Sequence, residues 1–482
     1  DGALEAQAFE RAATLLELAA ETPDPPRPVA ELRARQADAL AQAGFGTKAA
    51  EAVTLALAEE PRVELRRLRA RLLVTSGEVP RGAAEWSELL EAHGVRLPAT
   101  EGAALLPLLR WRYLPSLPLG RPPSAERLET IFRASETLGP FRPLAATVLA
   151  ARLRVDARRA DHPRFRALSC YLEAVFQANL GSFALAQRLL DEGREQVQPA
   201  PLSLQIWYVT TRGVCATLEG RFEEGARLTR EAVELAYRHP REEHGLLEGD
   251  IVRAYTFHVW ALVMSGQLDA AHTAIRDRLP LAVRRADLVH TDALRHGPVS
   301  LNRLARDQPH EAERQSALST ELWSANGESP PLDHGLTTAV RVALYRGDGS
   351  RAWELFEAAR TTMRRRGFFR FALYGAELRS LRARAAVARA ATLPQAERAP
   401  LLRVALRESK RIRQAPIHCA EALADLASCN VTALAGSSGE RTASLETLRA
   451  SALDAGLRMH AGMACLALGV DANDDWPEVN RL

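Results

Sequence analysis

One segment of the chain combines the residue types of a phosphate-binding loop. Residues 44–52 read GFGTKAAEA, so two glycines, a threonine and Lys48, one of only two lysines, open a predicted helix. A helix N-terminus attracts anions through its unpaired backbone N–H groups. In a nucleotide-binding loop, however, a glycine precedes the lysine, Ser or Thr follows it, and a strand leads in. Here Thr47 precedes Lys48 and no strand is predicted, so we interpret the segment as a turn between helices.

Histidine and cysteine suggest metal ligands at three places. His239 and His244 belong to HPREEH, whereas the zinc motif HxxEH places its two histidines four residues apart on one helical face. A spacing of five residues rotates two side chains by about 140° on a helix. The other two places are the pairs His418–Cys419 and His460–Cys465, and neither has a matching second pair. We therefore expect packing or solvated positions for all of them, and we predict no metal and no cofactor.

Two further segments resemble binding motifs. DANDDW at 471–476 begins like a calcium loop, but Trp476 replaces the required glycine and Leu482 stands where the loop needs glutamate. We interpret it as part of a disordered acidic tail. MRRRGFF at 363–369 could contact phosphate groups or stack on bases. In a chain with a net charge of +3 we favour a helix end, with arginine at the C-terminus and phenylalanine in the core.

Motifs of catalysis do not occur in the sequence. A kinase glycine loop, an HRD catalytic loop, a DFG triplet and a GxxxxGK[ST] phosphate loop are all missing, and no Ser, His and Asp grouping has the strand context of a nucleophile elbow. We predict no catalytic residues, and hence a chain that is not an enzyme. The alternative, an autonomous helical enzyme, would require activity of the isolated chain.

The composition predicts helices throughout. Apolar residues make up 47% of 482 residues, with Ala and Leu dominant, and the basic residues are almost all arginine. These residues and glutamate are strong helix formers. Aromatic residues reach only 6%, and β-branched residues show no period-2 alternation, so we predict an all-α chain.

Charge and cysteine usage limit the partners and the compartment. A net charge of +3 is near balance for this length, so we expect neither nucleic acid nor membrane as a partner. No run of about 20 apolar residues suggests a membrane span. Five scattered cysteines without CxxC spacing suggest small core residues in a reducing compartment. We predict a cytoplasmic location.

Internal repetition is the main structural signal. An apolar helix runs into a turn centred on glycine, or once on aspartate, at Gly44, Gly77, Gly181, Gly220, Gly266, Asp307 and Gly347. Glycine can adopt the positive φ that ends a helix. Five or six residues later comes an alanine that lets the second helix approach, at Ala49, Ala186, Ala226, Ala271, Ala312 and Ala352. Each unit is therefore predicted to be an antiparallel helix pair.

The spacing of these turns suggests the architecture of the repeat. Apart from the interval between Gly77 and Gly181, consecutive turns lie 33 to 46 residues apart, which brackets and exceeds the roughly 34-residue tetratricopeptide (TPR) period. We predict a TPR-like α-α superhelix, a solenoid with a concave inner wall. Its first helices mix polar and aromatic side chains that we predict to bind a partner or small effector in the groove, namely Gln205, Trp207, Tyr208, Arg212, Arg253, Tyr255, His258 and Trp260. About half of these must instead face the core.

Proline-rich stretches divide the chain. The segment around LPLLRWRYLPSLPLGRPP is the clearest interruption, and further loops are expected at Pro23–Pro28 and at Ser324–Gly335. We predict four regions: N-terminal helical repeats at 1–96, an irregular connection at 97–126, a central TPR-like array at 127–410, and C-terminal helices with a polar tail at 411–482. The start at Asp1 suggests a piece of a longer protein.

From Ile206 onward, the order of segments resembles a family of large bacterial fusion proteins. The resemblance rests on VCATLEGRFEEGARLTREA, FHVWALVMSGQLDAA, VALYRGDGSRAWELFEAA with ELRSLRARAAVARAA, and the helix pair near LRMHAGMACLALG. The family joins a serine/threonine kinase, an AAA or STAND-type ATPase and a C-terminal helical repeat tail. The resemblance covers about the last three fifths of the chain well, and it covers the part before Arg127 only by helix content.

The resemblance implies a regulatory tail. The chain would act as a sensor or adaptor that restrains or directs upstream kinase and ATPase domains until a ligand or partner binds, and it would contain no active site of its own. Two alternatives stay open. The chain could be the sensor arm of a STAND-type ATPase transcription activator, with a helix-turn-helix domain as its neighbour, or it could be a free-standing TPR adaptor.

Overall fold

The computed structural model describes residues 8–100, 102–113, 121–246, 248–285, 287–325 and 334–470. Every regular element within these ranges is an α-helix or a short 3-10 helix, and none is a strand. The predicted all-α class is therefore confirmed. Neighbouring helices pack in pairs, an arrangement compatible with a helical repeat.

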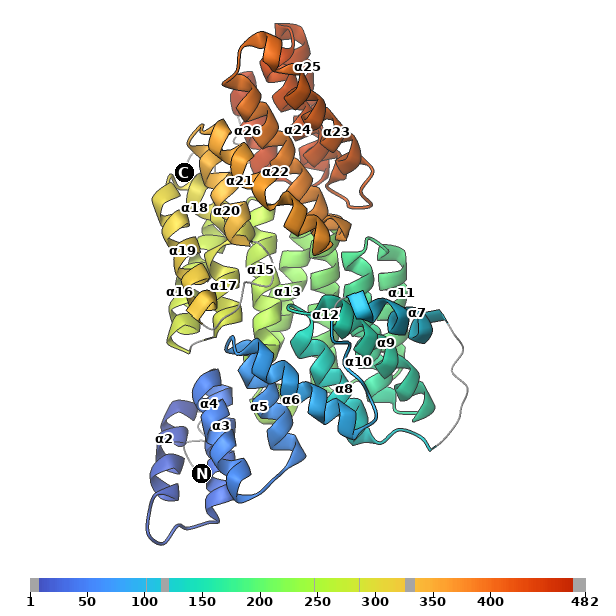
Figure 1. The fold of residues 1–482 in the computed structure, drawn as a ribbon, viewed down its shortest axis with the longest axis vertical. Helices are drawn as coiled ribbons and strands as arrows, with labels where there is room; N and C mark the ends of the chain where they lie inside the picture. The colour runs from blue at the N-terminus through green and yellow to red at the C-terminus, as the bar shows by residue number, and fades with distance from the viewer. Residues whose placement is uncertain are drawn as a thin grey trace.

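The helices follow one another with short connections, and Figure 1 shows α2 and α25 at opposite ends of the long axis. The N-terminal part contains α2 (Phe9–Ala20), α3 (Val29–Ala43), α4 (Gly46–Glu59), α5 (Val63–Thr75), α6 (Val79–Ala92), η1 (Gly102–Ala104) and α7 (Leu105–Tyr113). The next part contains α8 (Ala125–Leu138), α9 (Pro143–Arg159), α10 (Pro163–Asn179), α11 (Phe183–Glu195), α12 (Leu202–Glu219), α13 (Phe222–Arg238), α14 (Arg241–His244) and α15 (Glu248–Met264).

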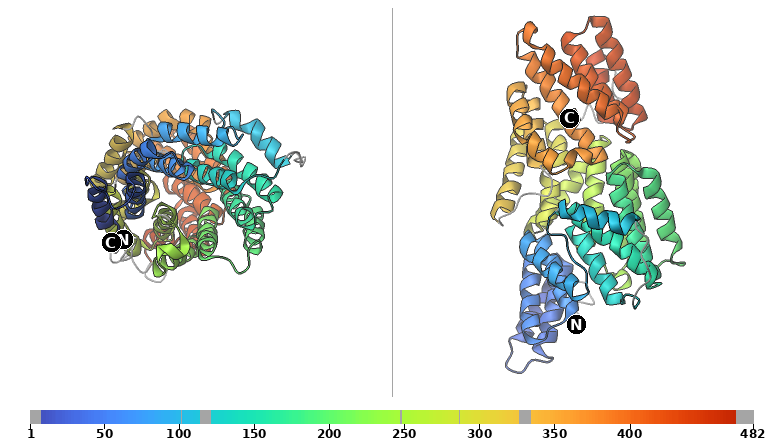
Figure 2. Two further views of the ribbon diagram at one scale, coloured as in Figure 1. Left: turned by 90° about the horizontal axis from the view of Figure 1, so that it is seen from below. Right: turned by 45° about the vertical axis from the view of Figure 1, so that its right-hand side comes forward.

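The remaining helices form the C-terminal half. They are α16 (Leu268–Arg284), α17 (Leu288–Arg295), η2 (Gly297–Val299), α18 (Ser300–Ala305), α19 (Pro309–Ala325), α20 (His334–Tyr345), α21 (Gly349–Arg365), η3 (Phe368–Arg370), α22 (Ala372–Ala391), η4 (Gln395–Glu397), α23 (Ala399–Arg413), α24 (Ala420–Ala435), α25 (Ser438–Asp454) and α26 (Arg458–Leu468). Seen along the long axis, successive helices follow a curved path (Figure 2).

The turns between paired helices share one backbone geometry. All six turn glycines named above have φ between 75° and 95°, and Asp307 has φ of 55°. At the first turn, the N–H of Phe45 donates to the carbonyl of Leu40 over 2.8 Å, and the N–H of Gly44 donates to Ala41. This is the Schellman arrangement, which satisfies carbonyls at the end of the helix. Asp161, with φ of 48°, makes the same kind of turn between α9 and α10.

Small residues allow the paired helices to approach. The fifth residue after the turn is fully buried at Ala49, Ala271, Ala312 and Ala352. Gly82 takes this place after Gly77, and a Cβ there would lie 2.8 Å from the carbonyl oxygen of Ala70. After Gly220 the closest residue is Gly225, where a Cβ would lie 2.3 Å from Thr217 Oγ1, and the predicted Ala226 follows it. Glycine therefore replaces alanine where the helices come closest.

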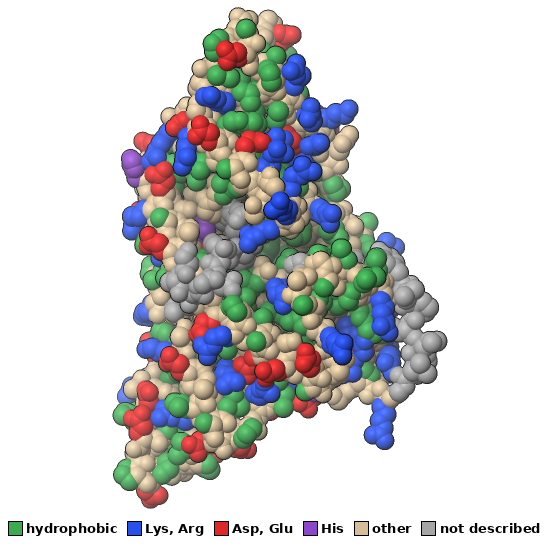
Figure 3. Space-filling view, in the orientation of Figure 1, with side chains coloured by type: hydrophobic (Ala, Val, Ile, Leu, Met, Phe, Trp, Pro, Cys, Tyr) green, Lys and Arg blue, Asp and Glu red, His purple; other side chains and the backbone are tan. Residues whose placement is uncertain are grey.

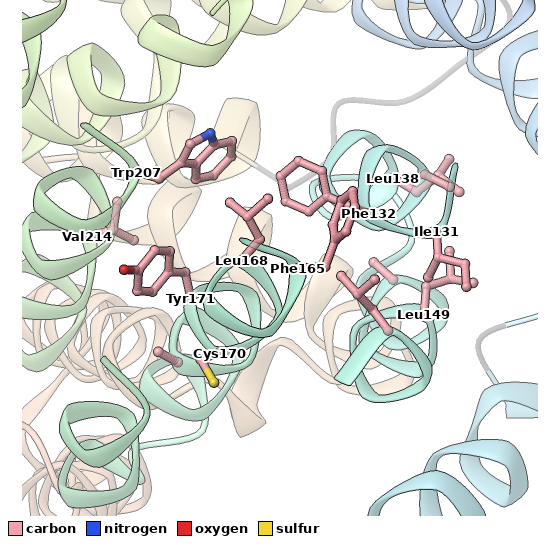
Figure 4. Packing of buried hydrophobic residues seen from close by; sticks show 14 of the residues in the cluster. Ile131, Phe132, Leu138, Leu149, Phe165, Leu168, Cys170, Tyr171, Trp207 and Val214 are labelled. Atoms are coloured by element: carbon pink, nitrogen blue, oxygen red, sulfur yellow. The ribbon is translucent and has the colours of Figure 1, made fainter. Parts of the chain in front are cut away.

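Aromatic rings lie at the centre of the largest core, whose residues come from helices between α5 and α19 and include Trp323 of α19. Figure 4 shows Phe132 of α8, Leu168 of α10 and Trp207 of α12 turned toward one another. The rings of Phe132 and Trp207 meet edge to face, with centroids 5.5 Å apart. Each helix of this part thus covers a neighbour that could not bury its apolar face alone.

The helix that precedes the Asp307 turn is broken into α17 and α18. The sequence pattern did not indicate this break. Between α17 and α18, His296 is extended and Gly297 has φ of 65°. The carbonyls released by the break accept hydrogen bonds from arginine: Arg303 donates to Arg295 and Leu294 over 2.7 and 3.1 Å, and Arg341 donates to Gly297 over 2.7 Å. Burial lowers the pKa of Arg303 to about 10, so its guanidinium stays charged at neutral pH.

The N-terminal helices return to the middle of the chain. Arg71 of α5 donates to Asp250 of α15 over 2.8 Å, across 179 residues of sequence. Arg284 of α16 pairs with Glu10 of α2 at 3.1 Å. Figure 1 shows the end of α5 beside α15, as these contacts require. The first helices are therefore held by α6 through the chain itself and contact α15 and α16 through these two ion pairs.

The connection predicted as irregular at 97–126 contains a helix. Helix α7 begins at Leu105 and packs on α9 through Leu108, and Arg152 stacks at 3.8 Å on the ring of Trp111. Pro107 lies in the first turn of α7, where its missing N–H has no partner to lose. Residues 114–120, 326–333 and 471–482, which include parts of two predicted loops and the calcium-like segment, lie outside the described residues. The predicted domain limits stay a prediction.

Other predicted details can be located directly. MRRRGFF is a helix end, because α21 stops at Arg365 and Phe368 lies in the core. All five cysteines are buried, and none of them forms a disulfide in the described part of the chain. No helix among the described residues has both the length and the apolar run that a bilayer span needs. Figure 3 shows acidic and basic side chains interspersed over the visible face.

The close approach at Gly82 can be tested by adding one methyl group. Glycine to alanine inside a helix usually stabilises by up to about 1 kcal/mol. Gly82→Ala should instead lower the free energy of unfolding by about 1–3 kcal/mol, since its Cβ would meet Val74 and the Ala70 carbonyl. Gly439→Ala in α25, where a Cβ meets nothing within 4 Å, is the control. Urea unfolding followed by circular dichroism measures both, and equal stabilisation would contradict this packing.

Candidate binding surface

The eight predicted groove residues lie on α12 and α15, but they do not share one surface. Helical geometry turns neighbouring residues by about 100°. Trp207 and His258 are 7% and 9% exposed, so these two side chains contribute to packing. Gln205 is exposed and donates to the Ala200 carbonyl at the start of its own helix, over 2.7 Å. The six residues other than Gln205 and Trp260 form three groups, and whether any of them binds a partner stays a prediction.

The first group joins α12, α15 and α8. Arg253 lies over the ring of Trp207, with its guanidinium carbon 5.1 Å from the ring centroid. The same guanidinium donates to Glu136 Oε1 over 2.5 Å. The other carboxylate oxygen, Glu136 Oε2, is buried without a hydrogen-bond partner within the described part of the chain. A buried acceptor of this kind costs free energy unless water or a ligand satisfies it.

An ionic network continues from this group toward the N-terminal helices. Asp250 accepts from Arg71 over 2.8 Å and from Arg133 over 3.4 Å. The Asp250 side chain is 1% exposed and that of Arg71 is 8% exposed. Arg133 also donates to Glu129 over 2.8 Å. Burial alone would lower the pKa of Arg133, but the carboxylates of Asp250, Glu129 and Glu136 raise it. Every charge in this network therefore has an opposite partner nearby.

The second group lies where α15 meets α13, α16 and α17. The hydroxyl of Tyr255 donates to the Ala274 carbonyl over 3.0 Å, and its ring lies 5.9 Å from that of His290. His258 Nδ1 donates to the Ala226 carbonyl over 3.0 Å. Burial, and secondarily the charge of Arg230, lowers the pKa of His258, while its bond to Ala226 opposes this shift. His258 is therefore held neutral as a link between α15 and α13.

The third group is the most accessible. Tyr208 is half-buried against Tyr171, with ring centroids 6.0 Å apart. The guanidinium carbons of Arg194 and Arg212 each lie 5.6 Å from the Tyr208 ring centroid. Arg212 keeps 35% of its side chain exposed. The eighth residue, Trp260, is separate from all three groups and packs against Phe257 at 5.4 Å.

A small pocket lies between the N-terminal helices and the central ones. Gly44, Arg71 and Ser76 line one side, and Arg278, Arg285 and His290 line the other. Its volume is about 90 Å³, the space of about three water molecules. Ligand sites for drug-sized molecules are roughly 300–1,000 Å³. The pocket therefore fits water or a small ion at the junction rather than a larger effector.

The closest approach to a catalytic arrangement lies at the broken helix. His296 Nε2 and Asp292 Oδ1 are 2.6 Å apart. Ser319 Oγ donates to the same Asp292 oxygen over 2.7 Å, so the serine hydroxyl is turned toward the carboxylate and not toward a histidine base. Trp323 Nε1 is a third donor to that oxygen, over 2.9 Å. We interpret this buried network as support for the helix break.

The candidate metal ligands are separated in the structure. His239 Nδ1 lies 2.9 Å from Glu243, whereas His244 Nδ1 accepts from the N–H of Leu246. His418 Nε2 approaches the Asp454 carbonyl at 3.3 Å. Over the described ranges, no three His, Cys, Asp or Glu side chains lie close enough to hold a metal ion.

The sequence analysis missed Phe132, Arg133, Glu136, Asp250 and Arg71. Their contacts with Trp207, Arg253 or each other span 75 to 179 residues, so no local spacing could indicate them. Helix periodicity could have placed Phe132 and Glu136 on one face of α8, since they lie four residues apart.

Comparison with known proteins does not assign this surface to a family. No protein-family model matches the chain, and a search of the curated proteins gives no significant match.

The Arg71–Asp250 pair should carry the contact between α5 and α15. Asp250→Ala leaves two buried guanidinium groups without this partner, and breaking a buried pair in this way costs about 3–5 kcal/mol. We expect the N-terminal helices to detach, so that amides of α5 exchange hydrogen faster while those of α12 do not. Arg284→Ala, which removes the exposed pair with Glu10, should cost at most about 1 kcal/mol. Equal exchange of α5 in both variants would contradict this assignment.

His460 should make stability depend on pH. Burial, followed by the charge of Arg384, lowers its pKa to about 4, below an unfolded value of about 6.5. The unfolded chain therefore binds more protons between these values, so stability is full above about pH 6.5 and decreases as pH falls toward 4. Because His460 as a residue is only partly buried, we expect a loss of about 1–3 kcal/mol. We would measure the free energy of unfolding in urea at several pH values. In His460→Gln the decrease between about pH 6.5 and 4 should disappear, and the same decrease in the variant as in the wild type would contradict the prediction.

Proposed function

We propose that this chain is a TPR-like superhelix that acts as a non-catalytic protein-interaction and sensor region. Its role would be to regulate a serine/threonine kinase and an ATPase in the same bacterial signalling protein. Support for the superhelix comes from the recurring helix pairs with their Schellman turns and small contact residues. Support for the regulatory role comes from the resemblance of the segments after Ile206 to the tails of kinase and ATPase fusion proteins.

The observation that favours binding is the half-exposed Tyr208 with two guanidinium groups near its ring. Tyrosine and arginine dominate the binding energy of many protein interfaces, because they combine large apolar area with directed hydrogen bonds. Arg212 and Arg194 each contact this ring while Arg212 keeps over a third of its side chain in solvent. A partner could therefore cover Tyr208 and bond the arginines without unfolding any helix.

Regulation by this surface requires two states of the whole protein. A partner shifts their equilibrium only by its difference in affinity for the two states. A partner that touches α10, α11 and α12 together would favour one relative placement of these helices. The contact between α12 and α22 offers a route by which that placement reaches the C-terminal helices.

The full-length reading frame around the chain gives the first test. A kinase glycine loop and a phosphate loop upstream are expected. A STAND-type ATPase beside a helix-turn-helix domain would favour the transcription-activator sensor arm instead. The absence of both would leave a free-standing adaptor and contradict the regulatory proposal.

The second test measures the regulated activity. In the full-length protein we expect the double variant Tyr208→Ala, Arg212→Ala to change the rate of ATP hydrolysis or autophosphorylation at least fivefold. The control is Arg227→Ala on α13, whose exposed side chain pairs only with Glu231 at 3.4 Å in the described structure. Equal rates in the wild type and the double variant, with unchanged circular dichroism, would contradict a regulatory role of this surface.

A further inference from the structure

A second pocket, which shares no lining residue with the Tyr208 surface, is lined in part by arginine. It lies between α9, α10 and α11 and has a volume of about 230 Å³. Arg154 and Arg158 of α9 and Arg166 of α10 contribute guanidinium groups to its lining. Glu192 of α11 is the one carboxylate among the lining residues. Three positive charges thus face one negative charge, at a pocket that leaves 55% of the Arg158 side chain exposed.

The hydrogen bonds leave donors of these arginines unused. Arg154 and Arg158 each donate to one oxygen of Glu192, over 2.7 and 2.9 Å. Arg166 pairs with Asp161 at 3.2 Å, at a carboxylate that is 84% exposed. The Nε atoms of Arg154 and Arg166 are buried and have no acceptor in the described part of the chain. Buried N–H groups of charged side chains seldom go without an acceptor, so each of them points to a missing one.

The remaining lining of the pocket offers no second carboxylate. Ser169 contributes a hydroxyl, which donates to the Arg166 carbonyl over 2.8 Å and can still accept. Cys170 lies at the pocket as a thiol, because burial, followed by the charge of Glu192, raises its pKa to about 12. Figure 4 shows Cys170 on the side of α10 away from Trp207. The pocket therefore lies on the side of α10 away from Trp207, and it meets the aromatic core only through Cys170 among its lining residues.

Size and charge together select the ligand. At about 230 Å³ the pocket is smaller than the roughly 300–1,000 Å³ of sites for drug-sized molecules. A phosphate group carries about −1.5 to −2 charges at neutral pH and has several strong acceptor oxygens. Guanidinium groups bind such oxygens through paired N–H donors. The excess of two positive charges in the lining matches one phosphate group.

We propose that this pocket binds a phosphate group, either as inorganic phosphate or as the head of a small phosphate monoester. Glu192 occupies Arg154 and Arg158 in the unliganded protein and keeps their charges paired. An entering phosphate competes with Glu192 for these two arginines and bonds the free Nε–H groups of Arg154 and Arg166. The carboxylate therefore weakens binding and makes it reversible.

This arrangement predicts opposite effects of two substitutions in the same ion pair. We would measure the saturable broadening of the 31P signal of inorganic phosphate by the full chain, at constant ionic strength set with sodium chloride. Arg158→Gln should weaken phosphate binding at least fivefold, because a donor and a charge are lost. Glu192→Gln should strengthen it at least threefold, because the competing charge is removed. Arg188→Gln, an exposed arginine on α11 outside the pocket, should leave it unchanged.

The signs of these effects distinguish a site from a general loss of structure. Arg158→Gln breaks one ion pair and Glu192→Gln breaks two, so destabilisation alone would weaken binding in both. Phenyl phosphate in place of inorganic phosphate separates the two sources, since tighter binding of the ester assigns the site to a monoester. Failure of the wild type and of Glu192→Gln to bind either probe would overturn the proposal. So would equal weakening by Arg158→Gln and Arg188→Gln. If Arg158→Gln does not fold, the sign of the Glu192→Gln effect decides.

Discussion

Close contact between the two helices of a pair constrains every other part of this structure. In most pairs the second helix approaches the first closely where the residue five positions after the turn has a side chain no larger than methyl, as at Ala49, Gly82 and Gly225. The left-handed turn residue fixes the angle at which that second helix starts. When both conditions hold, the two helices of a pair lie close together. The larger apolar residues further along each helix then pack between neighbouring pairs, where they form the core.

Much of the fold could be predicted because these two conditions are local in sequence. Gly44 and Gly220 each indicate a turn, and the small residues after them indicate a contact, without knowledge of any distant residue. The broken helix at His296 could not be predicted in this way. The carbonyls that the break releases accept hydrogen bonds from Arg303 and Arg341, and Arg341 lies 44 residues from Gly297 in sequence. Helix α7 was missed because the run of prolines that follows it in the sequence, Pro115, Pro118, Pro122 and Pro123, was interpreted as breaking any helix in the whole segment.

The binding surface could be predicted only to the level of the helix. Composition identifies α12 and α15 as rich in aromatic and charged residues, but burial depends on rotation about each helix axis. Trp207 and Tyr208 are adjacent in sequence, yet one packs on Phe132 and the other meets two arginines. The pocket between α9 and α11 gave no sequence signal at all. Arginines are frequent in this chain, and only the packing shows which of them share one carboxylate.

The Arg71–Asp250 pair has a consequence for the synthesis of the protein. The two residues are 179 positions apart, so α5 leaves the ribosome long before α15 exists. At about 5–20 residues per second, that interval lasts roughly 9–36 s. During this time the N-terminal pairs can form their own local contacts, but the side of α5 that meets α15 stays uncovered. A nascent chain stalled before Asp250 would therefore present this face to chaperones, whereas a chain extended beyond α15 could bury it.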